Sequence, residues 1–184
     1  MASENFMKLV SERRSIRHFL PKKVPREVIE SCLEAARLAP SAENVQPWRF
    51  LVLDEPERIR EFGEQAFSGL FRFTRWALKA PVLVVMLAKL DFLANRIGAH
   101  LQGTQYYLLD LGIAGTHLMM RAYEQGLGGC WIGWFNAKKA AEALDVPKKY
   151  RVVCCMALGY YEEPKKRRKK KYALEKVAWF NEMK

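Results

Sequence analysis

Three arginines and a serine lie within five residues near the start of the sequence, in the segment Arg13–Arg17 (RRSIR). A guanidinium is a planar fork that binds two phosphate oxygens at once, and a serine hydroxyl adds a neutral donor. In an extended segment alternate residues share a side, so Arg13, Ser15 and Arg17 would face a common ligand. The segment therefore indicates a phosphate site, and the alternative is a solvated basic turn.

A second segment, Ala39–Trp48 (APSAENVQPW), carries short uncharged polar side chains between two prolines. The prolines restrict the path of the chain, while Ser41, Asn44 and Gln46 supply donors and acceptors. A rigid polar loop of this kind can hydrogen-bond a heterocycle or a sugar chain. The alternative is an ordinary connection between a helix and a strand.

A third segment, Gly126–Phe135 (GLGGCWIGWF), is rich in glycine. Glycine allows a ligand to approach the backbone closely, so main-chain N–H groups here could face a flat molecule. The spacing does not match the G-x-G-x-x-G dinucleotide fingerprint, and no P-loop lysine follows. Trp131 and Trp134 could stack on a substrate or fill the core and a subunit contact.

The cysteines and histidines do not indicate a metal site, because neither type shows ligand spacing. Cys154 and Cys155 are adjacent in an apolar run and would point to opposite faces of a strand. We expect the cysteines to be free and buried, as in a reducing cytosol. Cys130 lies in the glycine-rich segment, where packing as a small apolar residue is favoured over a redox role.

The net charge of +11 raises the possibility of a nucleic-acid partner, but its distribution argues against one. The run Lys165–Lys171 (KKRRKKK) carries seven positive charges, and without it 24 basic residues face 20 acidic ones, a net of +4. A body this close to neutrality is not typical of a nucleic-acid groove. The rival interpretation is a nucleic-acid-binding module acting through this run, or an anchor on acidic lipid, with salt-sensitive binding and no bound chromophore.

The length predicts a single domain over residues 1–184. The order of the expected elements favours the α+β class, because helices and strands do not alternate strictly. One long helix over 100–125 is apolar nearly all round and must lie in a large core or a subunit interface. No signal peptide or membrane-spanning run is visible, so we expect a cytoplasmic protein. The other expected helices are 3–14, 25–39, 56–67 and one capped by Asn136 that ends at Leu144; the expected strands are 48–53, 81–88, 128–133 and 150–160.

Four segments in this order resemble the FMN-dependent nitroreductase family over essentially the whole chain: RRSIR, APSAENVQPWRF, GLGGCWIGWF and ALGYYEEPKKRRKKKYALEKV. The resemblance implies a nitroreductase-like fold, with a central, mainly antiparallel sheet flanked by helices. It also implies a homodimer with the long helix in the dimer core and two FMN sites, each built from both subunits.

The resemblance assigns cofactor-binding residues to all four segments and no catalytic side chain. It implies Arg13, Arg14, Ser15 and Arg17 for the phosphate and ribityl chain; Pro40, Ser41, Ala42 and Asn44, closed by Gln46, from the partner subunit; the backbone of Ile132 and Gly133 facing flavin N5; and Lys169 and Lys171 as a basic pair for the phosphate.

The activity that this resemblance implies is reduction of a small acceptor by NAD(P)H, through hydride transfer at flavin N5 in a ping-pong cycle. The acceptor would be a nitroaromatic, a quinone or a flavin. Two departures concern the substrate: Trp131 and Ile132 stand where relatives often have a carboxylate, and 62–79 shows no identifiable asparagine for the pyrimidine edge. A dehalogenase, a flavin-destroying enzyme, or a flavin-binding relative without NAD(P)H turnover are the alternatives on the same scaffold.

Overall fold

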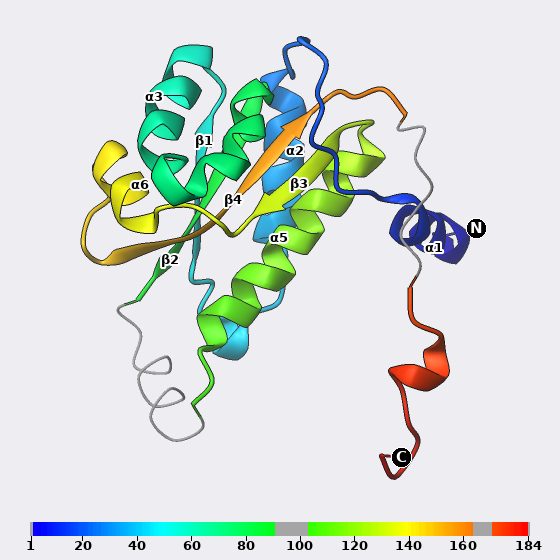
Figure 1. The fold of residues 1–184 in the computed structure, drawn as a ribbon. Helices are drawn as coiled ribbons and strands as arrows, with labels where there is room; N and C mark the ends of the chain where they lie inside the picture. Colours follow the sequence, from blue (N-terminus) through cyan, green and yellow to red (C-terminus); the bar gives the residue numbers. More distant parts are fainter. Residues whose placement is uncertain (1, 91–102, 164–170, 184) are drawn as a thin grey trace.

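The computed structural model describes residues 2–90, 103–163 and 171–183, and within them four strands form one sheet (Figure 1). The strand order is β1-β2-β4-β3, and all three strand pairs are antiparallel. The α+β prediction with a mainly antiparallel sheet is therefore confirmed. The strands are β1 (Trp48–Leu53), β2 (Val82–Lys89), β3 (Gly128–Ile132) and β4 (Tyr150–Gly159).

Helices flank this sheet, and most begin and end within three residues of the predicted bounds. The cap prediction is confirmed, because Asn136 Oδ1 accepts from the Lys139 N–H at 3.1 Å. No helix in the described ranges is both long and apolar enough to cross a membrane. The helices are α1 (Ala2–Glu12), α2 (Arg26–Arg37), α3 (Pro56–Ala66), α5 (Tyr106–Glu124) and α6 (Ala137–Ala143), with the 3₁₀ segments η1 (Ala42–Asn44), η2 (Gly69–Lys79) and η3 (Leu174–Lys176).

The start of the long helix was predicted wrongly, and one 3₁₀ segment was missed. The long helix starts at Tyr106 rather than His100, because residues 103–105 are not helical and Gly103 adopts a left-handed φ of 67°. His100 itself lies outside the described residues. No element was predicted over η2, which fills most of the stretch between α3 and β2.

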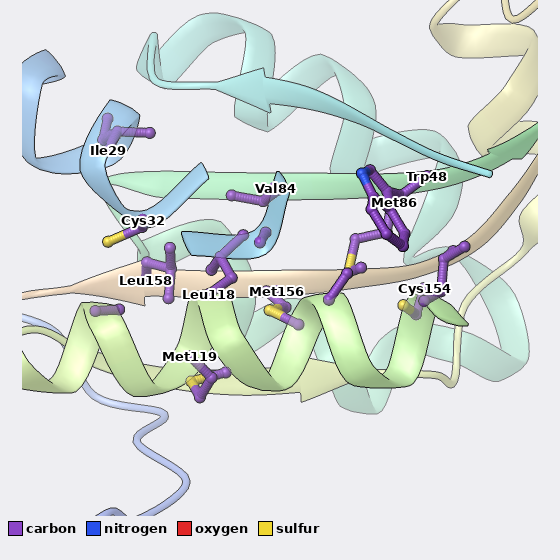
Figure 2. Close-up of a cluster of buried hydrophobic side chains, with 14 of the residues drawn as sticks. Ile29, Cys32, Trp48, Val84, Met86, Leu118, Met119, Cys154, Met156 and Leu158 are labelled. Atoms are coloured by element: carbon purple, nitrogen blue, oxygen red, sulfur yellow. The ribbon is translucent and has the colours of Figure 1, made fainter. Parts of the chain in front are cut away.

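The sheet is buried on both faces, which explains the continuous apolar run of β2. Val84 and Met86 face α2 and α5, as Figure 2 shows, whereas Leu83 and Val85 face α3, η2 and α6. A strand covered on both sides needs apolar residues at every position. Cys154 packs in the core on the α2 and α5 side of the sheet, and Cys155 packs in the core on the opposite side. The prediction that these adjacent thiols point to opposite faces of a strand is therefore confirmed.

The segment that follows α1 lies along the outer edge of β3. Ser15 forms a parallel bridge with Gly129, and the Ile16 N–H donates to the Gly129 carbonyl at 3.0 Å. The Ile16 side chain is buried at this edge. The backbone of RRSIR is thereby fixed beside the glycine-rich strand.

Candidate cofactor site

Three polar side chains of the RRSIR segment gather beside β3. Burial raises the pKa of the Cys130 thiol, while the charge of Arg17, a hydrogen bond from Ser15 and the charge of Arg13 oppose that rise. All three residues therefore lie near enough to this thiol to affect its pKa. This arrangement agrees with the alternation expected of an extended chain.

Arg14 lies beside a different group. Its charge opposes the rise in the pKa of Tyr161, which burial and the neighbouring Tyr123 raise to about 12. The Tyr161 ring packs against the Gly128 backbone, where an added Cβ would come within 2.7 Å of it. Arg14 thus acts on Tyr161, and it is not among the groups that shift the pKa of Cys130.

The two arginines of the cluster carry charge that the described part of the chain does not neutralise. Among the described residues, neither Arg13 nor Arg17 forms an ion pair with a carboxylate. The Arg17 guanidinium instead lies 5.6 Å from the centroid of the Trp76 ring, a cation–π contact. Two uncompensated guanidiniums beside a serine hydroxyl form a donor set that fits a phosphate.

The contact with Trp76 shows that η2 forms one wall of the site, which sequence reasoning missed. The Trp134 indole N–H donates to the Leu70 carbonyl at 3.3 Å, and the Trp134 and Phe71 rings are 5.4 Å apart. η2 therefore lies against both Arg17 and the residues that follow β3. The only signal in the sequence was the mixture of aromatic and basic residues in FRFTRW.

Gly133 differs from the glycines of β3 in what surrounds it. A Cβ at Gly128 would meet Ile16 at 2.6 Å, and one at Gly129 would meet Met119 at 2.6 Å, so packing requires both glycines. At Gly133 an added Cβ would meet nothing within 4 Å, and its φ is not in the left-handed range. Neither internal packing nor backbone strain explains this glycine, whereas close approach of a ligand would.

The side chain of Ile132 fixes the backbone just before this open position. Ile132 is buried among the residues that pack against α3 and α6, and it pairs with Cys155 in β4. The backbone at Ile132 and Gly133 is thus held by the sheet on one side and open on the other. Such a position can present main-chain groups to a flat ligand.

The Ser41–Gln46 loop has an unusual backbone. Glu43, Asn44 and Gln46 all have left-handed φ values, of 50°, 56° and 49°. A non-glycine residue in this region costs about 1–3 kcal/mol, somewhat less for asparagine, and persists only when its surroundings enforce it. This loop is therefore strained, and a strained polar loop is typical of a functional position.

Hydrogen bonds hold the loop in this conformation. The Gln46 N–H donates to Ser41 Oγ at 3.0 Å, and the Gln46 side-chain amide donates to Asn44 Oδ1 at 3.2 Å. The Ala42 N–H donates to Asp110 Oδ1 at 3.0 Å, which ties the loop to α5. The loop thus presents its polar groups from a defined backbone.

Within one chain the RRSIR segment lies away from the Ser41–Gln46 loop. The loop is bonded to Asp110, whereas Gly129, the β3 residue that pairs with Ser15, packs against Met119, nine residues further along α5. That separation corresponds to about 13 Å along the helix axis. Of the predicted basic pair, Lys171 is exposed and Lys169 lies outside the described residues.

A shallow cleft of about 390 Å³ lies elsewhere, between α2 and β1. Its lining includes Trp48, Gln46 and the exposed ion pair of Glu34 with Arg37. The cleft touches the end of the strained loop but none of the RRSIR arginines. It is therefore separate from the cluster around Cys130.

Comparison with known proteins gives consistent matches over most of the chain. The sequence profile of the Nitroreductase family matches residues 10–160. An NADH dehydrogenase of Thermus thermophilus is 30% identical over 178 residues, which cover 83% of this chain and 84% of the relative. The solved structure of an FMN-dependent nitroreductase from Clostridium difficile R20291 superposes with a TM-score of 0.77 at 29% identity, over 96% of this chain and 99% of that one.

A shorter match has higher identity. Iodotyrosine deiodinase 1 of Rattus norvegicus is 43% identical over 68 residues, which cover 35% of this chain and 24% of the deiodinase.

Proposed function

Because this chain belongs to the nitroreductase family, we propose that it is a single-domain, FMN-dependent oxidoreductase that uses NAD(P)H to reduce a small electron acceptor. The observation that carries the proposal is the pair of uncompensated arginines near Cys130, together with the open backbone at Gly133, three residues further along the chain. One region supplies cations for a phosphate, and the other supplies space for a flat ring.

The chemistry that bound FMN supplies is transfer of a hydride through N5, from NAD(P)H to an acceptor that uses the same cleft afterwards. The protein contributes binding and electrostatics. We propose that the phosphate and ribityl chain are held by Arg13, Arg14, Ser15, Arg17, Lys169 and Lys171, that the ring faces the backbone of Ile132 and Gly133, and that Pro40, Ser41, Ala42, Asn44 and Gln46 reach the flavin from a second copy of the chain.

The charge of the cluster supports the phosphate end of this assignment. Arg13 and Arg17 both lower the pKa of Cys130, and neither has a carboxylate partner in the described part of the chain. A phosphate would replace the water around both guanidiniums with charge-assisted hydrogen bonds. The backbone bridge of Ser15 to Gly129 holds this residue at the edge of β3, where its side chain interacts with Cys130.

Unpartnered apolar surfaces support a homodimer. Leu109 and Ile113 lie four residues apart on α5, and both are exposed, Leu109 by 55%. Phe6 on α1 and Phe180 near the C-terminus are also exposed, and residues 171–183 lie away from the sheet in Figure 1. A second copy of the chain would cover such surfaces, and it would also bring its strained loop to the cluster around Cys130.

The acceptor that we propose is a nitroaromatic, a quinone or a free flavin. The exposed aromatic surface of Phe73 and Trp134 on the η2 side of the site suits a planar apolar molecule. The local match with a deiodinase supports a second candidate, an aryl halide reduced with loss of the halide. Turnover assays with one acceptor of each class would separate these candidates.

The first test is the visible absorption spectrum of the purified protein before and after anaerobic addition of NADPH. We expect a flavin spectrum with close to one FMN per chain that bleaches on reduction. Protein that stays colourless after incubation with excess FMN would refute the proposal. Flavin that binds but is reduced by neither NADH nor NADPH would identify a flavin-binding relative without turnover.

A further inference from the structure

Asp110 stands out in the first half of α5 as a buried charged residue. Its side chain is 3% exposed, and among the described residues it is the one charged or polar side chain that is buried. Its neighbours along the buried face of the helix are apolar, including Leu111 and Ala114. Oδ1 accepts the Ala42 N–H, but Oδ2 has no hydrogen-bond partner in the described part of the chain.

A buried carboxylate with an unpaired oxygen destabilises a fold, and an apolar side chain at this position would avoid that cost. Packing therefore does not explain Asp110. Its one hydrogen bond reaches the first residue of η1, 68 positions earlier in the sequence. The contact that this carboxylate makes is with the strained loop.

We propose that Asp110 is a positioning residue that fixes the Ser41–Gln46 loop on the central helix, in the conformation that binds the cofactor across the subunit interface. The inference deepens the proposed function and rests on it for the identity of the ligand. Asp110 acts through the backbone of Ala42 rather than by touching the flavin.

The other hydrogen bonds of the loop could not fix it on α5. The bonds of Ser41 with Gln46, and of Gln46 with Asn44, are internal to the loop and would move with it. Among the described residues, the loop is joined to α5 by the hydrogen bond from the Ala42 N–H to Asp110. Burial raises the pKa of Asp110 and the Ala42 N–H opposes that rise, so loop docking and the charged carboxylate favour each other.

Three variants test the role. Asp110→Leu removes the acceptor, Asp110→Asn keeps an oxygen for the Ala42 N–H, and Ala42→Pro removes the N–H without touching Asp110. Ala42 has helical backbone angles and follows the extended Ser41, so proline is compatible with its conformation. The readouts are amide hydrogen exchange of residues 43–46 in the apoprotein and the dissociation constant for FMN.

We expect Asp110→Leu and Ala42→Pro each to accelerate exchange in the loop and to weaken FMN binding by about tenfold or more. Asp110→Asn should stay within about threefold of the wild-type affinity and keep wild-type exchange. The double variant should be no worse than either single variant, because both remove the same bond. If Asp110→Leu does not fold, the comparison of Ala42→Pro with Asp110→Asn still decides the question.

Wild-type exchange in both disruptive variants would overturn the inference, as would accelerated exchange with unchanged FMN affinity. If the wild-type protein binds no FMN, the proposed function fails. The exchange data, measured without flavin, then separately support or overturn the role of Asp110 in fixing the loop.

Discussion

The RRSIR segment and the Ser41–Gln46 loop are both polar, but they are built by opposite means. RRSIR has an ordinary extended backbone paired with Gly129, and its chemistry lies in two uncompensated guanidiniums. The loop has no net cationic character, and its distinguishing feature is a backbone with three left-handed residues. The first region can attract an anionic ligand by its charge. The second offers uncharged donors and acceptors from a fixed backbone, so it can only recognise the shape and hydrogen-bonding groups of a ligand.

The difference also concerns what holds each region in place. RRSIR is fixed by sheet-like pairing at the edge of β3, and Ile16 anchors it in the core. The loop is fixed by side chains, of which Asp110 is itself costly to bury. RRSIR and the loop lie at different positions along α5. In the proposed function they would therefore meet only between the two subunits of a dimer.

The largest effect is expected from the charged region. Arg13→Ala combined with Arg17→Ala removes two charge-assisted contacts of about 1.5–3 kcal/mol each, so FMN affinity should fall by about 100-fold or more. Titration of the apoprotein with FMN measures this loss. Arg58→Ala is the matched control, because Arg58 is an exposed arginine on α3 that pairs with Glu61. Full FMN occupancy in the double variant would contradict the phosphate assignment.

Mixing two inactive variants tests whether the two regions meet across subunits. One variant carries Arg13→Ala and Arg17→Ala, and the other carries Ser41→Ala and Asn44→Ala. Random exchange of subunits would make half of the dimers mixed, each with one intact site, so about one quarter of the wild-type FMN sites should return. The measurement is bound flavin per chain after the mixture is refolded.

No recovery on mixing would mean that each site is built within one chain. The matching control is each variant refolded alone, which should bind FMN as weakly as before. Full recovery is not expected in any arrangement, because half of the random dimers would pair identical subunits.

Much of the architecture could be read from the sequence because local pattern and fold agree. β2 and β4 are apolar runs with several β-branched valines, and Asn136 is a standard N-cap that the structure confirms. The start of α5 was misplaced because the apolar pattern continues upstream of Gly103, where the backbone turns left-handed. η2 was missed although its residues are amphipathic at helical spacing, so a helical segment could have been predicted there from the sequence.

The candidate site was predictable in part for the same reason. The types and spacing of Arg13, Ser15 and Arg17 indicate a phosphate directly. The left-handed conformations of Glu43 and Gln46 could not be predicted, since neither residue type prefers them. The bond between Ala42 and Asp110 joins residues 68 positions apart, and nothing local in either segment indicates it.

A smaller effect is expected from relieving strain in the loop. Glu43 is exposed and has a left-handed φ of 50°, a conformation that glycine adopts without steric cost. Glu43→Gly should therefore stabilise the apoprotein by about 0–1 kcal/mol, since the greater freedom of glycine in the unfolded chain offsets part of the gain. Thermal unfolding measures this, and Glu57→Gly in the first turn of α3 should be destabilising instead. A loss of stability in Glu43→Gly would show that the glutamate side chain makes a contribution larger than the strain.

The smallest effect concerns the thiol inside the cluster, and it reports the charge of RRSIR without any ligand. Burial raises the pKa of Cys130, and Arg17 is the strongest of the groups that oppose the rise. Since the thiolate is the reactive form, alkylation of Cys130 should be slow near neutral pH and should accelerate as pH rises toward the shifted pKa. Arg17→Ala removes a stabilising cation from the thiolate, which raises the pKa of Cys130 further, so the rate at pH 8 should fall by about a few-fold. Mass spectrometry of the Cys130 peptide gives the rate, with Arg58→Ala as the variant that should leave it unchanged. An unchanged rate in Arg17→Ala would mean that the guanidinium lies too far from the thiol to act on a phosphate bound beside it.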